Sequence, residues 1–420
     1  MENYSSAELK AYVKDEVGVA NLDLSRKGLS RIPDAVTELT EVEELKLNNN
    51  NLTELPTSIN KLKNLVRLYL HRNRLTELPS EIGDLKELRS LNVSSNQLVS
   101  LPTSIQKLNQ LEELYLSGNK LRDLPSEIGD LKELRSLEVS YNQLVSISTS
   151  IQKLNQLEVL HLNGNRLTEL PSWIGDLKAL RWLAASANQL VSLPISIQKL
   201  NQLVGLDLEG NKLTELPSEI GDLKELSWLD VSANQLVGLP TSIQKLNQLK
   251  ELNLCDNEFR ELPSEIGDLK ELRRLDVSNN QLVSLPTSIQ KLNQLEELNL
   301  DGNRFTELPS EIGDLKELGR LDVRNNQLAS LPTSIHKLNR LEELNLSDNR
   351  LTELPSEIGD LKELRRLDVR KNLLVGLPTS IHKLNQLEEL NLFGDVPSYA
   401  IHDLDMSRTS ITGGCGDNFQ

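Results

Sequence analysis

Two tryptophans, Trp182 and Trp228, stand 46 residues apart, with Gly205 midway between them and Asp207 just beyond it. An indole face attracts a cation, and a nearby carboxylate adds charge attraction, so this set could bind a lysine or arginine side chain. The same rings could instead hold an apolar anchor of a partner, because tryptophan is enriched at interface hot spots. The alternative is that the two rings only pack over small residues, or arose by copying of one 46-residue unit.

Residues that could perform covalent or metal chemistry are sparse. The five histidines are dispersed, and none has a cysteine, histidine or carboxylate at metal-ligand spacing. No serine lies in a nucleophile-elbow context. Cys415, in Gly-Gly-Cys-Gly, is the one candidate nucleophile, and a flexible tail cannot hold a base in register with it. We therefore expect no enzyme activity, no metal and no cofactor.

A strict repeat must position these residues. Fifteen asparagines recur every 23 residues from Asn50 to Asn372, and each closes a copy of L-x-x-L-x-L-x-x-N-x-L. Self-similarity at a fixed period predicts a solenoid of stacked coils. Repeat positions are numbered here from the first leucine, so that Leu88 is position 1 and Asn96 is position 9.

Each part of the repeat predicts one part of a coil. Positions 3 to 5 predict a short strand with residues 3 and 5 pointing outward, since side chains alternate across a strand. The asparagine at position 9 offers an acceptor and two N–H donors, which can satisfy backbone groups of the turn inside the coil. A Leu-Pro pair then turns the chain, and apolar residues three apart, such as Ile105 and Leu108, predict a 3₁₀ or single-turn helical segment. Stacking gives a concave parallel sheet with short helical segments on the convex side.

The convex segments carry a second period, because PSEIGDLKE alternates with PTSIQKLNQ. We interpret this acidic and weakly basic striping as charge balance between neighbouring coils. A charge-striped docking face is the alternative.

The pattern divides the chain into three regions. Residues 1–18 predict an N-terminal helical cap, because apolar residues recur there at helical spacing. Residues 19–394 hold sixteen full repeats and a partial one. Residues 395–420 predict a C-terminal cap followed by a flexible tail from Ser407 onward.

The 23-residue form LxxLxLxxNxLxxLPxxIxxLxx resembles the intracellular Ras-group and bacterial-type leucine-rich repeat proteins. The resemblance covers about residues 19–394 and implies an α/β solenoid, the leucine-rich repeat horseshoe. It also implies scaffolding and recognition of protein partners. Attached catalytic modules distinguish members of this family, and no GxxxxGK[ST] phosphate loop occurs here.

Departures from the repeat mark places where something other than coil packing selected the residue, and they concentrate between residues 141 and 233. Trp182 and Trp228 occupy position 3 of the eighth and tenth repeats, so the rings would lie about 9–10 Å apart, with Gly205 as the floor of a slot. The predicted partner-binding residues are Tyr141, Val159, His161, Trp182, Ala184, Gly205, Asp207 and Trp228.

Position 3 alternates in sign from Glu251 to Glu389, so neighbouring strands carry opposite charges that we expect to pair. A site for an acidic partner is the alternative. Its candidate residues are Arg274, Arg320, Arg324, Arg366 and Arg370.

The bulk composition limits the kinds of partner. A formal net charge of −16 would repel a phosphate backbone, so we expect no nucleic-acid binding. Residues 1–14 lack an apolar run of signal-peptide length, and no run reaches transmembrane length, so we expect no membrane contact. The two cysteines fit free thiols in a reducing compartment.

We therefore predict a cytoplasmic, monomeric, non-enzymatic scaffold that binds a protein partner on its concave face around Trp182 and Trp228. One alternative is a translocated bacterial effector, delivered into a host cell without a signal peptide, or a regulatory repeat arm that targets a host or signalling protein. Another is a structural spacer with no dedicated site.

Overall fold

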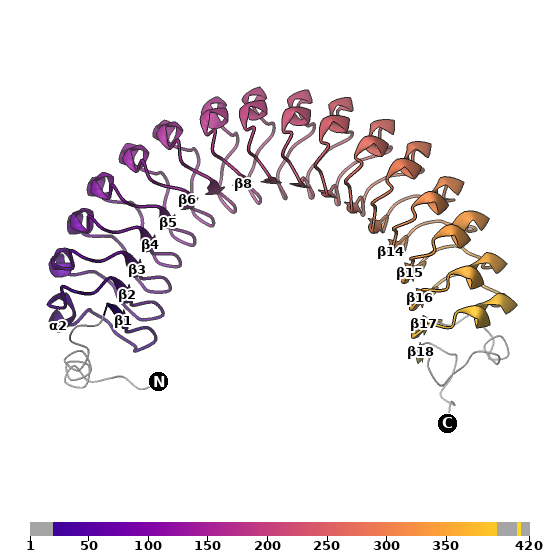
Figure 1. Cartoon of the computed structure of the whole chain (residues 1–420), viewed down its shortest axis with the longest axis horizontal. Coiled ribbons are helices and arrows are strands. Elements are labelled where there is room, and N and C mark those ends of the chain that lie inside the picture. Colours follow the sequence, from indigo (N-terminus) through magenta and orange to yellow (C-terminus); the bar gives the residue numbers. More distant parts are fainter. Residues whose placement is uncertain (1–19, 393–409, 413–420) are drawn as a thin grey trace. The chain divides into compact units, whose positions relative to one another are not determined.

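The computed structural model describes residues 20–392 and 410–412. The chain divides into two compact units, Met1–Asn211 and Lys212–Gln420, and both repeat the same coil. Each coil has a three-residue strand, a turn at the asparagine and a return segment that contains a short helix. Within each unit the strands line the inner side and the 3₁₀ helices the outer side (Figure 1). The predicted solenoid fold is thus confirmed, while the predicted helical cap over residues 1–18 lies outside the described residues.

The first unit contains nine described strands. They are β1 (Asn21–Asp23), β2 (Glu44–Lys46), β3 (Arg67–Tyr69), β4 (Ser90–Asn92), β5 (Glu113–Tyr115), β6 (Ser136–Glu138), β7 (Val159–His161), β8 (Trp182–Ala184) and β9 (Gly205–Asp207). Its helices are α2 (Asp34–Thr37) and the 3₁₀ helices η1 (Thr57–Lys61), η2 (Ser80–Asp84), η3 (Thr103–Lys107), η4 (Ser126–Asp130), η5 (Thr149–Lys153), η6 (Ser172–Asp176) and η7 (Ile195–Lys199).

The second unit also contains nine described strands. They are β10 (Trp228–Asp230), β11 (Glu251–Asn253), β12 (Arg274–Asp276), β13 (Glu297–Asn299), β14 (Arg320–Asp322), β15 (Glu343–Asn345), β16 (Arg366–Asp368), β17 (Glu389–Asn391) and β18 (Ser410–Thr412). Its 3₁₀ helices are η8 (Ser218–Asp222), η9 (Thr241–Lys245), η10 (Ser264–Asp268), η11 (Thr287–Lys291), η12 (Ser310–Asp314), η13 (Thr333–Lys337), η14 (Ser356–Asp360) and η15 (Thr379–Lys383).

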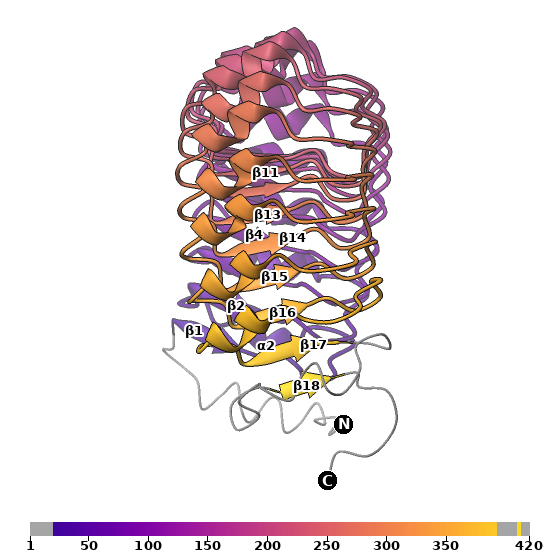
Figure 2. The ribbon, with the colours of Figure 1, turned by 90° about the vertical axis from the view of Figure 1, so that its right-hand side faces the viewer.

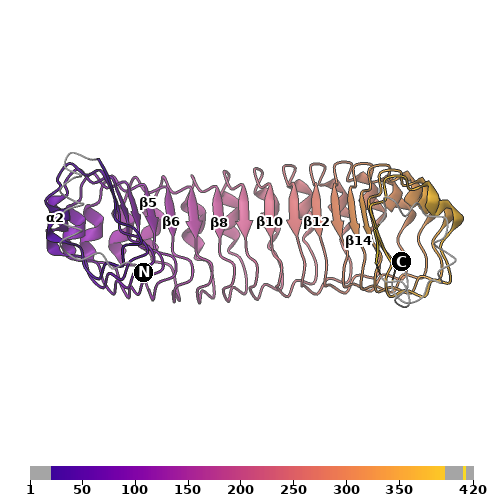
Figure 3. The same cartoon turned by 90° about the horizontal axis from the view of Figure 1, so that it is seen from below.

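The strands occupy positions 3 to 5 of the repeats, as predicted, and lie side by side in each unit (Figure 3). Neighbours pair in parallel with a constant offset of one repeat, such as Ser90 opposite Glu113. Leu91 and Val93 are fully buried between sheet and helices, and the same leucine positions form the core of every coil. The side chains at positions 3 and 5 therefore form two outward rows on the sheet. The surface that these two rows make is called here the concave face.

The asparagine at position 9 joins consecutive coils. Asn96 Nδ2 donates to the carbonyls of Val93 in its own repeat and of Leu70 in the preceding repeat, both at 3.0 Å. Its Oδ1 accepts the backbone N–H of Leu75 at 2.9 Å. The prediction that asparagine satisfies backbone groups inside the coil is confirmed. The structure adds that the side chain bridges two repeats, which explains why aspartate, an acceptor only, does not replace it.

The 3₁₀ helices begin after proline in nearly every repeat, where a fixed φ starts the return segment. Acidic and basic segments pair across adjacent coils, as in Lys245 with Asp222 at 3.3 Å and Lys291 with Asp268 at 3.3 Å. Figure 2 shows the helices of the second unit stacked along one side. The predicted charge balance between neighbouring coils is confirmed by these pairs.

One expectation about the C-terminal region needs correction. Ser410–Thr412 form strand β18, which pairs in parallel with β17, although this segment was predicted to be flexible tail. The backbone register places Ile411 beside Leu390, so the short sequence Ser-Ile-Thr adds one more strand to the sheet of the second unit. An unpaired β17 would present a row of free backbone groups, which favours such an addition.

Candidate functional site

The predicted recognition residues of the first unit lie on two adjacent rows of the concave face. The position-3 row runs from Val159 to Trp182 and Gly205, and the position-5 row contains Ala184 and Asp207 in the same strands. Val159, Trp182 and Asp207 are half-buried. The structure therefore brings most of the predicted first-unit residues onto one continuous patch.

The ring of Trp182 lies on the backbone of Gly205 in the next strand. A Cβ added to Gly205 would overlap three carbons of the indole, so only glycine leaves room for the ring in this position. Gly205 itself is buried. The predicted open glycine floor is therefore wrong: the ring of Trp182 occupies that space, because a flat indole gains contact area by lying on exposed backbone.

Two residues of the predicted contact set do not present side chains to a partner. Ala184 is only 2% exposed, because its methyl group lies between the longer side chains of His161 and Asp207 in the flanking strands. Gly205 is covered by Trp182. His161 lies 3.5 Å from a carboxylate oxygen of Glu138, which fixes one side of its ring.

Tyr141 is the most exposed aromatic residue of this region, at 67%. Its backbone has a φ of 54°, in the left-handed region that a bulky residue rarely adopts. The ring packs beside Gly164 in the next repeat, where an added Cβ would lie 2.6 Å from Tyr141 Cδ1. Position 8 has positive φ in every internal repeat of both units, and the glycine, asparagine and aspartate common there were the sequence signal for it.

Trp228 belongs to the second unit and Trp182 to the first, so the slot with two rings stays a prediction. Trp228 is half-buried and stands at one end of a groove on the concave face of the second unit. The groove has a volume of about 360 Å³ and extends across the strands to Asp322. Its charged lining residues are Asp230, Glu251, Arg274, Asp276, Glu297, Arg320 and Asp322.

The floor of this groove is the position-5 row, which was not predicted from the sequence. That row alternates Asp and Asn: Asp230, Asn253, Asp276, Asn299 and Asp322. Each asparagine amide donates to the preceding aspartate, at 2.8 Å for the first pair and 2.9 Å for the second. The sequence contains a signal for this floor, because Asp and Asn alternate at position 5 with the same 46-residue period as Glu and Arg at position 3.

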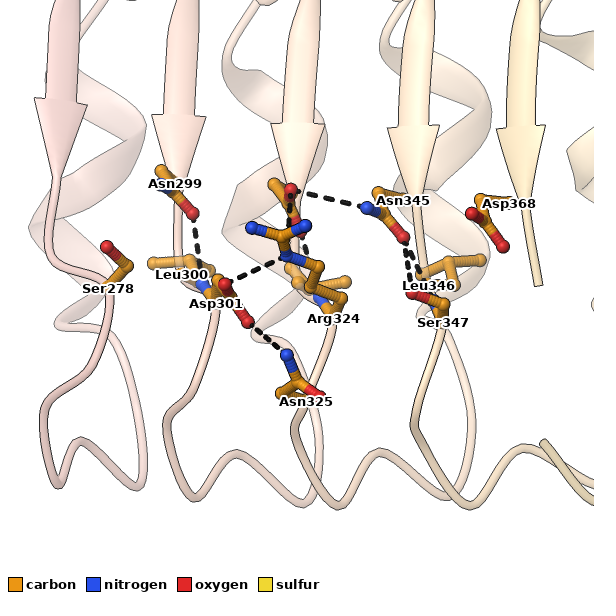
Figure 4. Close-up of polar contacts among 12 residues, drawn as sticks. Ser278, Asn299, Leu300, Asp301, Arg324, Asn325, Asn345, Leu346, Ser347 and Asp368 are labelled. Atoms are coloured by element: carbon orange, nitrogen blue, oxygen red, sulfur yellow. Dashed lines mark hydrogen bonds and ion pairs between the residues drawn. The ribbon is translucent and has the colours of Figure 1, made fainter. Parts of the chain in front are cut away.

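The predicted charge ladder at position 3 is confirmed. Arg320 Nε lies 2.9 Å from Glu343, and Arg274 pairs with Glu251 across adjacent strands. The other candidate arginines are paired as well: Arg324 Nε lies 2.8 Å from Asp301 (Figure 4), Arg366 pairs with Glu343, and Arg370 pairs with Asp368. Because these guanidinium groups have internal partners, the alternative of a site for an acidic partner gains no support.

Three further observations concern the remaining chemistry of the described residues. Burial raises the pKa of the Cys255 thiol to about 12, so this cysteine stays protonated at neutral pH. Residues 20–392 and 410–412 contain no cluster of three or more His, Cys, Asp or Glu side chains arranged to hold a metal ion. No helix within the same ranges is long and apolar enough to cross a membrane.

Family models of leucine-rich repeats match most of the chain. A model of the leucine-rich repeat region matches residues 68–163, 110–189 and 241–304. A second leucine-rich repeat model matches residues 18–75, 293–351 and 339–396. A comparison with curated proteins gives no match.

Solved structures give close matches. A leucine-rich repeat protein of Leptospira interrogans is 39% identical with a TM-score of 0.86, and the match covers 91% of this chain and 98% of that one. The plant peptide hormone receptor RGFR1, solved in complex with RGF2, is 29% identical with a TM-score of 0.68 over 90% of this chain and 71% of the receptor chain. YopM from Yersinia enterocolitica shares the fold, at 24% identity and a TM-score of 0.59, over 98% and 96% of this chain and of YopM.

Proposed function

The chain belongs to the leucine-rich repeat family, of the bacterial type, and from this premise we propose that it is a non-enzymatic, cytoplasmic scaffold that binds a protein partner on its concave face. We propose that Trp182 and Trp228 are the main contacts, each on the concave face of its own unit. Tyr141, Val159, His161 and Asp207 would extend the contact in the first unit.

The observation that carries this proposal is the half-buried indole of Trp182 at position 3, where other repeats carry mostly charged residues. Exposed tryptophan is rare on surfaces without a partner and is enriched among interface hot spots. The ring is already fixed on Gly205, so binding would require little further ordering of the side chain.

Relatives support the general role. The family is generally one of protein-interaction scaffolds, and the plant receptor named above is solved with a peptide hormone bound. That complex belongs to the receptor, and it supports the present proposal only by showing that the fold presents a surface for a peptide ligand.

The test is affinity capture from a lysate with the intact chain, its Trp182→Ala/Trp228→Ala variant, and a Trp173→Ala control. Trp173 is the third tryptophan and lies in η6 on the convex side, so the control removes an indole away from the concave face. All three proteins must first show similar thermal melting.

The proposal expects a partner that the intact chain and the Trp173→Ala control both retain and that the double variant loses. Equal capture by all three proteins would contradict a concave recognition site. Loss of partner capture in the Trp173→Ala control alone would indicate that the partner contacts the convex side.

A further inference from the structure

We infer that the groove of the second unit binds an extended basic segment of a partner protein, with lysine or arginine at every third residue. This inference rests on the proposed recognition function and adds the chemistry of the partner. It involves only residues of the second unit, from Trp228 to Asp322.

The charge of the groove favours a cationic ligand. Five carboxylates line it against two guanidinium groups. The positive groups are already engaged, because Arg274 pairs with Glu251 and Arg320 pairs with Glu343. The field that remains for a ligand is therefore negative, and complementary charge would guide and align a basic segment.

Two carboxylates of the groove floor are held in place by neutral donors. Asp230 accepts the backbone N–H and the hydroxyl of Ser232, at 2.9 and 2.6 Å. Asp276 makes the same two contacts with Ser278. Among the ion pairs of the described part of the chain, none includes Asp230 or Asp276. Their positions are thus fixed by neutral groups, and neither carboxylate is part of a described ion pair.

The spacing of the aspartates selects the form of the ligand. Asp230, Asp276 and Asp322 lie on every second strand, so neighbours are about 10 Å apart. A polyproline II helix has three residues per turn, so every third side chain lies on the same face, and three residues span about 9 Å. A segment lying across the strands would therefore place a basic side chain at each aspartate if such residues recur every third position. An α-helix rises only about 4.5 Å in three residues and would not match.

The two ends of the groove fit the same ligand. Trp228 stands in the same strand as Asp230, so its indole face can receive the first cation together with that carboxylate. At the other end, Arg324 Nε lies 3.6 Å from Asp322, yet burial still raises the pKa of Asp322 above its usual range. A cation from a partner would stabilise the ionised form.

The test uses two synthetic peptides of identical composition on the full-length chain. In the first, four lysines recur at every third position between alanine and proline residues. In the second, the four lysines are contiguous. Binding is measured by fluorescence anisotropy of labelled peptide at fixed ionic strength, because charge attraction depends on salt.

Two variants with the same change in net charge distinguish peptide binding at the groove from non-specific charge attraction to the rest of the chain. Asp230→Asn/Asp276→Asn neutralises the groove floor, whereas Asp268→Asn/Asp314→Asn neutralises two half-buried aspartates of the convex 3₁₀ helices in the same unit. We expect the spaced peptide to bind about tenfold more tightly than the contiguous one, and the groove variant to lose about tenfold while the convex variant changes less than about twofold.

Equal affinity for both peptides, or equal losses in both variants, would overturn the inference and leave only non-specific charge attraction. That result would not affect the proposed function, which is tested by partner capture with the tryptophan variants. Conversely, spaced-peptide binding together with equal partner capture by the intact chain and both tryptophan variants would leave the groove chemistry in place and contradict the proposed tryptophan contacts.

Discussion

The indole of Trp182 lies on the backbone of Gly205, its neighbour in the adjacent strand, and no other residue type would leave space for it. Tyr141 and Gly164 repeat this relationship at position 8, again with an aromatic ring beside a glycine of the next repeat. Both pairs lie in the region where the sequence departs from its own consensus. At Trp182 the departures are coupled, because the added ring comes with a glycine at position 3 of the next repeat that makes room for it.

Replacing Gly205 by alanine should displace the Trp182 ring, since the new methyl group would overlap the indole carbons. Because the ring is the outer end of a side chain, we expect the free energy of unfolding to fall by only about 1 kcal/mol, while the ring becomes more exposed. The measurement is the emission maximum of Trp182 in a Trp173→Phe/Trp228→Phe background, which should shift to the red. Gly238→Ala is the control, because an added Cβ there meets no atom within 4 Å. An unshifted spectrum in the Gly205 variant would contradict the stacked arrangement.

Tyr141→Asn should preserve or increase stability, although it removes an aromatic ring. Asparagine tolerates the left-handed backbone better than tyrosine, so relief of strain should raise the free energy of unfolding by up to about 1 kcal/mol. Partner capture should weaken, since strain of this kind is often kept for function. The control is Tyr69→Asn, in a strand with ordinary backbone angles, which should lower stability. A large loss of stability in the Tyr141 variant would show that the ring serves packing instead.

Asn280→Asp should be strongly destabilising, by about 3 kcal/mol or more. Asn280 Nδ2 donates to the carbonyls of Leu254 and Val277, at 3.0 and 3.1 Å, and an aspartate would leave both acceptors unpaired while burying a charge. Chemical denaturation measures the change. Asn293→Asp, at an exposed turn of the same unit, provides the same chemical change and should alter stability by less than about 0.5 kcal/mol. Similar losses in the two variants would refute the bridging role.

The position-3 ladder should contribute little per pair. A double-mutant cycle on Arg320 and Glu343, which lie 2.9 Å apart on the surface, should give a coupling energy below about 1 kcal/mol that decreases as salt is added. A coupling that is larger and independent of salt would mean that the ladder is shielded from solvent.

Asp322→Asn should raise the free energy of unfolding at neutral pH. This gain over the unmodified chain should become smaller as the pH is lowered. Burial raises the pKa of Asp322, so ionising it disfavours the folded state once the pH exceeds that pKa. Below the pKa of an unfolded aspartate both states hold a proton, and the variant loses its advantage. Thermal melting between pH 3 and pH 7 tests the sign, since a gain that grows toward low pH would contradict it.

The fold could be predicted from the sequence because one coil satisfies several local requirements at once. Each part of the coil is specified by a few residues, such as Leu91 for the strand, Asn96 for the turn and Leu101-Pro102 for the return segment. The same residue types recur in successive repeats, so each repeat forms the same coil. Paired charges such as Arg320 and Glu343 also followed from register alone.

Side-chain placement on the concave face could be predicted only in part. Position 3 showed that Trp182 points outward, but not that its ring lies down on Gly205, because that depends on contact area and not on the repeat. Ala184 illustrates the same limit, since its burial comes from the length of its neighbours. The strand at Ser410–Thr412 was missed because three residues carry too little pattern to predict a strand.

The most direct test of concave recognition is hydroxyl-radical footprinting of the three tryptophans, with and without a captured partner, read by mass spectrometry. Trp182 and Trp228 lie in strands β8 and β10, and Trp173 lies in the convex helix η6, so the chain carries its own internal control. The account predicts that the partner protects Trp182 and Trp228 from oxidation and leaves Trp173 unchanged. Protection of Trp173 with unchanged oxidation of the other two would contradict it.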